Sequence, residues 1–262
     1  MDDDAPLGPA DFDRFARHYD DEHASYTDDL PMWEGFAYRA GDRPILELAC
    51  GTGRIIEPVA RLGIRITGLD VSGAMLHVAR AKVARADLSD RVDLVEGDMR
   101  AFSLGREFGF AFIALNSLMH LETRADQRRA FGSVHRHLAP GGRFVVDVFN
   151  PDDGLPDPAT EGHLRLHCLK RRPDGSQLLH FQSMAVDRGA QVVSVTNYYD
   201  DTAPDGTVRR HMAPFRLRYV TVGELELMLD REGYMVEDLY GSYDLEPFQN
   251  GSPRVIAVAR KR

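Results

Sequence analysis

The chain has 262 residues, a length that suits one large α/β domain or one domain that carries an insertion. Hydrophobic residues make up 43% and charged residues 28%, which is ordinary for a globular protein and excludes a disordered or collagen-like chain. The formal net charge is −9, but residues 1–30 hold ten acidic and two basic residues, so the rest is nearly balanced. Because a balanced body cannot neutralise many phosphates, we expect no nucleic-acid partner.

Three further features of the composition indicate a compartment. No apolar run approaches the ~18 residues that a membrane span needs. The acidic start of the chain lacks the apolar stretch of a signal peptide. Two cysteines, Cys50 and Cys168, are too few for a disulfide framework or a structural zinc site. We therefore expect a cytoplasmic protein without a membrane partner.

Residues 44–149 alternate short apolar strands with helical segments. Strands are predicted at 44–49, 64–70, 92–98, 108–115 and 143–149, and helices at 54–62, from Ser72 onward, and at 123–138. Strands with nearly continuous apolar runs, separated by helices, predict a Rossmann-like α/β fold whose parallel sheet is covered on both faces. A ligand is expected at the carboxyl ends of the strands.

The pattern changes after Asn150. Four strands, at 164–169, 178–186, 191–199 and 207–220, are separated by turn residues and predict an inserted antiparallel β meander. A helix at 222–232 and strands at 235–243 and 254–260 follow; the last connection is too short for a helical crossover, so the last strand is expected to be antiparallel. The predicted units are an N-terminal segment (1–40), the cofactor-binding core (41–150), the insertion (151–220) and a return to the core (221–262).

The most informative segment is the loop Glu47-Leu-Ala-Cys-Gly-Thr-Gly53. Gly51 and Gly53 let the backbone approach a ligand closely at the start of a helix. Asp70 ends the next predicted strand, where a carboxylate can accept both hydroxyls of a ribose. The alternative is a tight strand–helix turn that binds nothing. The loop and the acidic residue occur together at the expected spacing, which favours a nucleoside site.

The same loop discriminates between nucleosides. A dinucleotide site would have a third glycine at position 56, which is Ile56 here. Glu47 places a carboxylate beside the loop, which repels a pyrophosphate and suits a ligand with an ammonium and a sulfonium group. S-adenosylmethionine has both, and its carboxylate can be held by loop amides. A nicotinamide-dependent oxidoreductase and a non-catalytic S-adenosylmethionine-binding protein are the alternatives.

These residues resemble the class I S-adenosylmethionine-dependent methyltransferases. The matching motifs are at 46–53, 68–72 with Met75, 96–100 and 138–142, in the order that the family has. Ala49 departs from the pattern, because many members have glycine there. The resemblance implies a seven-stranded, mostly parallel sheet with its last strand reversed, and S-adenosylhomocysteine as the product.

The resemblance also implies roles for individual residues. Asp70 would hold the ribose, Asp98 the adenine amino group, and the Met99 amide a ring nitrogen. Asp98 is alternatively a strand-end cap, and Met75 is alternatively a plain core residue. The predicted cofactor contacts are Glu47, Ala49, Gly51, Gly53, Asp70, Val71, Met75, Asp98, Met99 and Asn116.

The loop after the fourth predicted strand, at 115–121, faces the methyl group in this family. It has no Asn/Asp-Pro-Pro-aromatic sequence, which argues against methylation of DNA bases, and no carboxylate for a magnesium ion, so no metal is expected. His120 is the candidate base, because imidazole can accept a proton from an ammonium or a hydroxyl group. A helix-capping or buried structural histidine is the alternative.

The whole chain resembles bacterial small-molecule methyltransferases, above all the amino-sugar N-methyltransferases that place a meander over the site. This resemblance implies a small-molecule acceptor, with an amine favoured over a hydroxyl group, and a lid tyrosine, for which Tyr19 is the first match and Tyr26 the second. The acidic run at 20–22 is interpreted as a solvated face or as an attraction for a cationic acceptor. Two roles of the insertion are considered: it covers the pocket, or it pairs with a second subunit. A homodimer is therefore one of the two alternatives.

Overall fold

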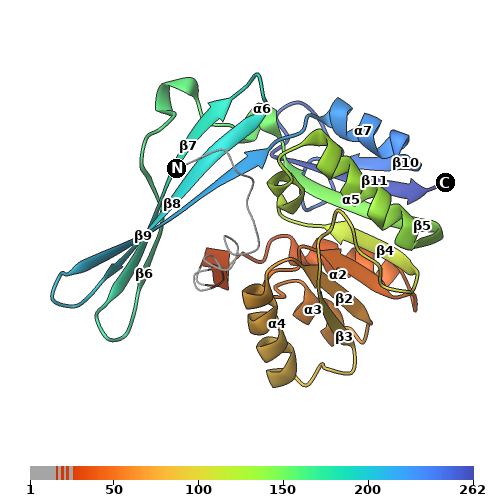
Figure 1. The fold of residues 1–262 in the computed structure, drawn as a ribbon, viewed down its shortest axis with the longest axis horizontal. Helices are drawn as coiled ribbons and strands as arrows, with labels where there is room; N and C mark the ends of the chain where they lie inside the picture. Colours follow the sequence, from red (N-terminus) through yellow and green to blue (C-terminus); the bar gives the residue numbers. More distant parts are fainter. Residues whose placement is uncertain (1–15, 17–18, 21, 24–25) are drawn as a thin grey trace.

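The computed structural model describes residues 16, 19–20, 22–23 and 26–262. Part of the predicted N-terminal segment thus lies outside the described residues. Figure 1 shows an α/β body from which a second sheet projects to one side.

The body contains a seven-stranded sheet in the order β10-β11-β5-β4-β1-β2-β3. Strands β1 to β5 run parallel, whereas β11 is antiparallel to both of its neighbours, β5 and β10. The predicted mostly parallel sheet with a reversed last strand is therefore confirmed. The strands are β1 (Ile45–Leu48), β2 (Ile66–Asp70), β3 (Val92–Glu96), β4 (Phe108–Ile113), β5 (Leu138–Phe149), β10 (Tyr234–Tyr240) and β11 (Arg254–Lys261).

Helices cover both faces of this sheet. Side chains of α2 (Leu30–Arg39), α3 (Ile56–Arg61) and α4 (Gly73–Arg85) pack on one face, and those of α5 (Arg124–His137) and α7 (Val222–Arg231) pack on the other. Because side chains alternate along a strand, Ile45 packs on the face that α2, α3 and α4 cover, and Leu46 packs on the face that α5 and α7 cover. Trp33 anchors α2, since its ring stacks on Phe112 with centroids 4.5 Å apart.

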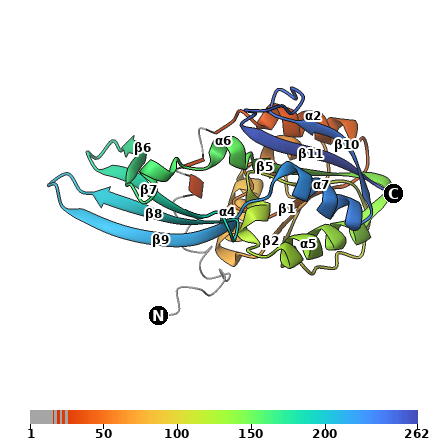
Figure 2. The same cartoon turned by 90° about the horizontal axis from the view of Figure 1, so that it is seen from above.

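The second sheet is the predicted antiparallel meander. Its strands, in the order β6-β7-β8-β9, are β6 (Arg165–Arg171), β7 (Gln177–Asp187), β8 (Val192–Thr202) and β9 (Val208–Arg218). The short helices α6 (Pro151–Gly154) and η2 (Pro158–Thr160) lead into it from β5. Figures 1 and 2 show the sheet as a long curved arm, which meets the body near the carboxyl ends of the parallel strands.

One buried arginine ties the arm to the body. Arg218, at the end of β9, donates to Gln127 of α5 at 2.8 Å and to Glu224 of α7 at 2.6 Å. Gln127 in turn donates to the Arg218 carbonyl at 3.1 Å. The side chain of Arg218 is therefore structural.

Within the part of the chain that the structure describes, no helix is long and apolar enough to cross a membrane.

Candidate active site

The glycine loop connects β1 to α3 through three residues with left-handed backbone conformations. The φ angles are +54° at Ala49, +54° at Gly51 and +78° at Gly53. Glycine adopts this region freely, whereas alanine there costs about 1 kcal/mol. At Gly53 a Cβ would also lie 3.4 Å from the Cβ of Ala79, so this glycine lets α4 pack closely against the loop.

Asp70, at the end of β2, is fixed by the backbone around it. The Gly51 amide donates to its Oδ2 at 2.8 Å, and the Ser72 amide donates to its Oδ1 at 2.9 Å. Ser72 itself caps α4, as predicted, by accepting from the Met75 amide at 3.1 Å. Each carboxylate oxygen of Asp70 can accept a second hydrogen bond. The arrangement can therefore receive two adjacent hydroxyl groups.

A cavity of about 310 Å³ opens above these residues; we call it the cofactor compartment. It contains most of the predicted cofactor residues, but Glu47, Gly53 and Asn116 are not among those that line it. The predicted residues in its lining are Tyr19, Ala49, Gly51, Asp70, Val71, Met75, Asp98, Met99 and His120.

Asp98 sits at the edge of this compartment and is already engaged. Its carboxylate accepts three hydrogen bonds from the Arg100 guanidinium, at 3.0, 2.9 and 2.6 Å, and one from the Arg100 amide at 2.8 Å. Burial alone would raise the pKa of Asp98, but these bonds hold it below its ordinary value. Asp98 thus accepts from the backbone at the end of β3, as expected for the strand-end cap that was its alternative role. An adenine amino group would share the Asp98 carboxylate with Arg100.

Glu47 lies in the middle of β1 and is buried. Its Oε2 has no hydrogen-bond partner among the described residues. Burial raises its pKa well above the ordinary range, against the opposing effect of the nearby Arg54 guanidinium. Such an orphaned carboxyl oxygen is stabilised by a cationic partner. Glu47 and the clamped Asp70 therefore fit the ammonium and the ribose of S-adenosylmethionine.

A second cavity of about 550 Å³ adjoins the first; we call it the acceptor compartment. It lies between the carboxyl ends of the strands and the inner face of the inserted sheet, with lining residues from η1 (Ser117–His120), β7, β8, β9 and the N-terminal segment. Four residues line both compartments: Tyr19, Met75, Ser117 and His120. A group passed from one compartment to the other would cross at these four side chains.

His120 ends η1 at this junction. Its ring lies against Phe215 of β9, with centroids 5.6 Å apart. Burial lowers the pKa of His120 to about 4, so the imidazole is neutral at pH 7. A neutral imidazole next to an acceptor is able to take up a proton.

Tyr19 lies over the glycine loop, where a Cβ on Gly51 would be 3.9 Å from its ring. Burial raises the pKa of Tyr19 to about 12, so the phenol stays protonated and covers the site rather than acting as a base. The neighbouring Asp20 accepts from Thr52 at 2.6 Å and from Lys82 at 2.6 Å. Asp20 therefore links the N-terminal segment to the glycine loop and α4, while its side chain stays 41% exposed.

Asn116 and Asp147 hold the ends of β4 and β5 together. Asn116 has a φ of +67°, and its Oδ1 accepts from the Phe149 amide at 2.7 Å. Asp147 accepts from the Leu115 amide at 2.9 Å and from the Arg254 Nε at 2.8 Å. Within the described residues no group of three or more His, Cys, Asp and Glu side chains could hold a metal ion.

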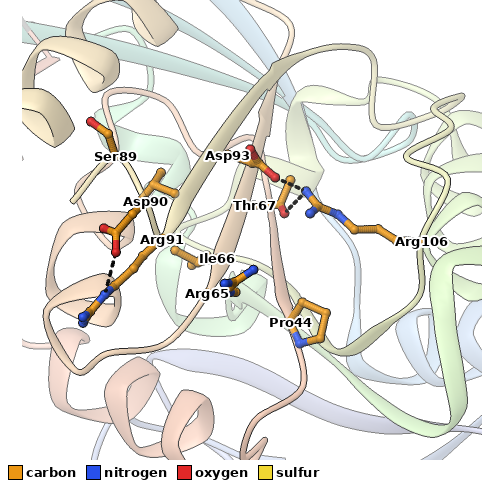
Figure 3. Close-up of a pocket in the computed structure, with 10 residues that line it drawn as sticks. Pro44, Arg65, Ile66, Thr67, Ser89, Asp90, Arg91, Asp93 and Arg106 are labelled. Carbon is orange, nitrogen blue, oxygen red and sulfur yellow. Dashed lines mark hydrogen bonds and ion pairs between the residues drawn. The ribbon is translucent and has the colours of Figure 1, made fainter.

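A third cavity lies at the opposite edge of the sheet, near the residues that precede β1 and β2 (Figure 3). In Figure 3 Arg106 points toward Asp93 and Thr67, with which it forms an ion pair and a hydrogen bond. Parallel sheets bind their ligands at the carboxyl ends of the strands, so this cavity is not the expected site.

Sequence reasoning missed several residues of the acceptor compartment. Ser117 lies within the loop that was singled out, but a lone serine gave no signal. His180 and Asn197 lie on different strands of the insertion, whereas Glu22 belongs to the acidic run that was interpreted as a solvated face or as an attraction for a cationic acceptor. Only the pairing register of β7 and β8 brings His180 and Asn197 to one face, and strand alternation alone cannot fix that register.

The reversed last strand, the glycine loop and the clamped acid together define the nucleoside-binding fold of methyltransferases. Comparison with known proteins agrees. A family described as a methyltransferase domain matches residues 45–142. The dTDP-3-amino-3,4,6-trideoxy-alpha-D-glucopyranose N,N-dimethyltransferase of Streptomyces venezuelae is 36% identical over 75% of this chain and 77% of its own. YqeM of Bacillus subtilis is also 36% identical, but the match spans 51% of this chain and 53% of that protein.

Solved structures extend the match over nearly the whole chain. The CcbJ methyltransferase from Streptomyces caelestis has a TM-score of 0.78 and 27% identity, and the match covers 96% of this chain and 97% of that one. The glycopeptide N-methyltransferase MtfA, crystallised with S-adenosylmethionine, has a TM-score of 0.57 and 26% identity over 91% of this chain and 96% of that one. The chain belongs to the S-adenosylmethionine-dependent methyltransferases, and S-adenosylmethionine is its cofactor.

Proposed function

We propose that this enzyme methylates an amino group of a small molecule, with His120 as the base. The observation that carries the proposal is the junction: a neutral imidazole lines both the cofactor compartment and the acceptor compartment. The similarity to N-methyltransferases of amino sugars and of a glycopeptide supports an amine as the acceptor.

The chain's own residues divide the work between binding and proton transfer. When bound, S-adenosylmethionine supplies a methyl group on a positively charged sulfur. Asp70 holds the ribose, Glu47 meets the ammonium and Tyr19 excludes water from above the loop. His120 accepts the proton that the acceptor nitrogen must lose. Catalysis then rests mainly on positioning the nitrogen, as expected for a displacement in which charge is dispersed.

The pKa of His120 favours an amine over a hydroxyl group. A base with a pKa of about 4 is too weak to generate an alkoxide. A neutral amine attacks through its own lone pair, so the methyl transfer itself needs no strong base, and the neutral His120 can accept a hydrogen bond from the nitrogen and pass its proton on to solvent.

The same proposal includes the surroundings of the enzyme. We propose that it acts in the cytoplasm. We also propose that it has no nucleic-acid partner, since the charge outside residues 1–30 is nearly balanced. We also propose the unit boundaries at 40/41, 150/151 and 220/221. The insertion covers the acceptor compartment of its own chain, a role supported by its lining residues, and a homodimer is not needed to complete the site.

The proposal is tested with matched pairs of small molecules that differ only in carrying an amino or a hydroxyl group at one carbon, such as methyl 3-amino-3-deoxyglucoside and methyl glucoside. Each is incubated with the protein and S-adenosylmethionine, and products are read by mass spectrometry. We expect methyl addition to the amine members of the panel. Methylation of hydroxyl members alone would refute the proposal.

A further inference from the structure

The inner face of the inserted sheet changes from apolar to polar along its length. Next to His120 it presents only apolar side chains, among them Val193, Val195, Met184, Phe215 and Leu217. Farther out, Gln182 donates to Asn197 at 3.0 Å, and Asn197 donates to the Tyr199 hydroxyl at 3.2 Å. We call Gln182, Asn197 and Tyr199 the polar row.

The distance between the two ends follows from the register. On β8, Val195 pairs with Phe215, which contacts His120, whereas Tyr199 pairs with His180. Four residues of extended chain separate these positions, which corresponds to about 13 Å. Asn197, the near end of the polar row, is two residues from Val195, or about 7 Å along the strand. An acceptor whose nitrogen lies at His120 therefore meets Asn197 and Gln182 first and Tyr199 farther out.

A carboxylate lies at the outer end of the polar row. Glu22, whose side chain is 12% exposed, has its Oε1 3.4 Å from the Nδ1 of His180. The Tyr199 hydroxyl forms a hydrogen bond with the same carboxyl group. The His180 ring stacks on Tyr199, with centroids 4.8 Å apart, which holds the two partners of Glu22 together.

Positive charge is scarce in this compartment. Among the described residues that line it, Arg254 is the one arginine or lysine, and its guanidinium is bound to the buried Asp147. The imidazoles of His23, His120, His167 and His180 all have a pKa lowered mainly by burial, so they are largely neutral at pH 7. Among the described lining residues, Glu22 is the acidic side chain that a ligand would meet.

Resting on the proposed function, we infer that the acceptor is an amine without a phosphate group, which offers hydroxyl or ammonium donors to Glu22 and the polar row. An ammonium or hydroxyl group can donate to this carboxylate, which is largely withdrawn from water. A nucleoside diphosphate would bring negative charges against Glu22 and find no available cation among the described lining residues. The same carboxylate thus recognises one class of acceptor and rejects the other.

The inference is tested by binding, without turnover. Protein saturated with S-adenosylhomocysteine is titrated by calorimetry with thymidine diphosphate and with neamine, a phosphate-free compound with several amino and hydroxyl groups. We expect the Kd for neamine to be lower by about tenfold or more, which corresponds to at least ~1.4 kcal/mol. An equal or lower Kd for thymidine diphosphate would overturn the inference.

Three variants locate the effect. Glu22→Gln should raise the Kd for neamine about tenfold, because it removes the charge that an ammonium group would contact, and Glu22→Lys should lower the Kd for thymidine diphosphate, because it adds a cation. Thr196→Val, on the same strand but the opposite face from Asn197, is the matched control and should change neither value. Unaltered neamine binding in Glu22→Gln, with S-adenosylhomocysteine affinity retained, would contradict the role of Glu22.

The outcomes separate this inference from the proposed function. If thymidine diphosphate binds and the amine of a nucleotide sugar is methylated, N-methylation holds and the inference fails. If neamine binds preferentially but only hydroxyl groups are methylated across the matched panel, the recognition of a phosphate-free ligand holds and the proposed function fails.

Discussion

The two compartments are built in different ways. The cofactor compartment is formed largely by short stretches that follow β1, β2 and β3, and its Asp70 is held by backbone amides. The acceptor compartment is formed by side chains from the N-terminal segment, η1, all four strands of the insertion and β11. A site made by local backbone geometry leaves a motif in the sequence, whereas a site made by side chains from distant elements depends on how those elements pair.

The largest effect is expected at the junction of the two compartments. His120→Gln should lower kcat by about 10²- to 10⁴-fold, the usual contribution of a general base. S-adenosylhomocysteine affinity should stay within a factor of about two, because the variant keeps a similar side-chain volume. Initial rates and calorimetry provide the two readouts. His77→Gln, at an exposed position of α4, is the control, and a wild-type rate for His120→Gln would rule out the base.

The pH profile sharpens this prediction. Since burial lowers the pKa of His120 to about 4, its imidazole is neutral above about pH 5, and kcat should not show an acid limb near the ordinary histidine pKa of about 6.5. Below pH 5 the protonated ring can no longer accept a proton, so kcat should fall. A limb near pH 6.5 that disappears in His120→Gln would contradict the buried, low-pKa imidazole.

A smaller effect, confined to the cofactor side, is expected at Asp70. Asp70→Ala removes the carboxylate that receives the ribose and frees the Gly51 and Ser72 amides, so the Kd for S-adenosylmethionine should rise about 10- to 100-fold. Isothermal titration calorimetry of both proteins measures this Kd. Asp93→Ala, whose carboxylate faces the third cavity, should bind the cofactor normally. If both variants bind alike, the ribose assignment is wrong.

The smallest effect concerns the attachment of the arm. Arg218→Met leaves Glu224 and Gln127 without their buried partner and should lower the free energy of unfolding by about 2 kcal/mol at pH 7. Burial alone would raise the pKa of Glu224, but its hydrogen bonds, that from Arg218 among them, keep it below the ordinary value. The stabilisation is therefore present above the unfolded pKa of Glu224, and the difference between the proteins should shrink as pH falls through its folded pKa.

Denaturant unfolding of both proteins at several pH values measures this difference. Arg216→Met is the matched control, because Arg216 is more exposed and its pairing with Glu122 is longer, at 3.4 Å. We expect a loss of under about 1 kcal/mol for it. If the two variants lost equal free energy of unfolding, the Arg218 hydrogen bonds would not be what attaches the inserted sheet to the body.

Much of the body could be predicted from the sequence. Apolar runs, the capping Ser72 and the short connection before β11 each act locally, and they predict the strand segments and the reversed last strand, whereas the order of the strands in the sheet was not predicted from them. The clustering of Ala49, Gly51, Asp70 and Met75 also follows, since the carboxyl ends of parallel strands meet at one edge of the sheet.

The remaining features depend on tertiary packing. Glu47 was predicted to place a negative charge beside the loop; its position in a strand covered on both faces also buries it and raises its pKa, which the sequence did not indicate. Asn116 was predicted as a cofactor contact, yet its side chain accepts from Phe149 across two strands. Asp20 lies near Thr52 and Lys82 only once the N-terminal segment folds back over the loop.

The tie at Arg218 has a practical consequence. The inner-face side chains of β7 and β8 belong to a hydrogen-bonded sheet that Arg218 attaches to α5 and α7, whereas Asp70 is held by the amides of Gly51 and Ser72 in the body. Exchanging alternate residues along these strands would therefore give catalysts for new nucleophiles while the donor chemistry is left untouched.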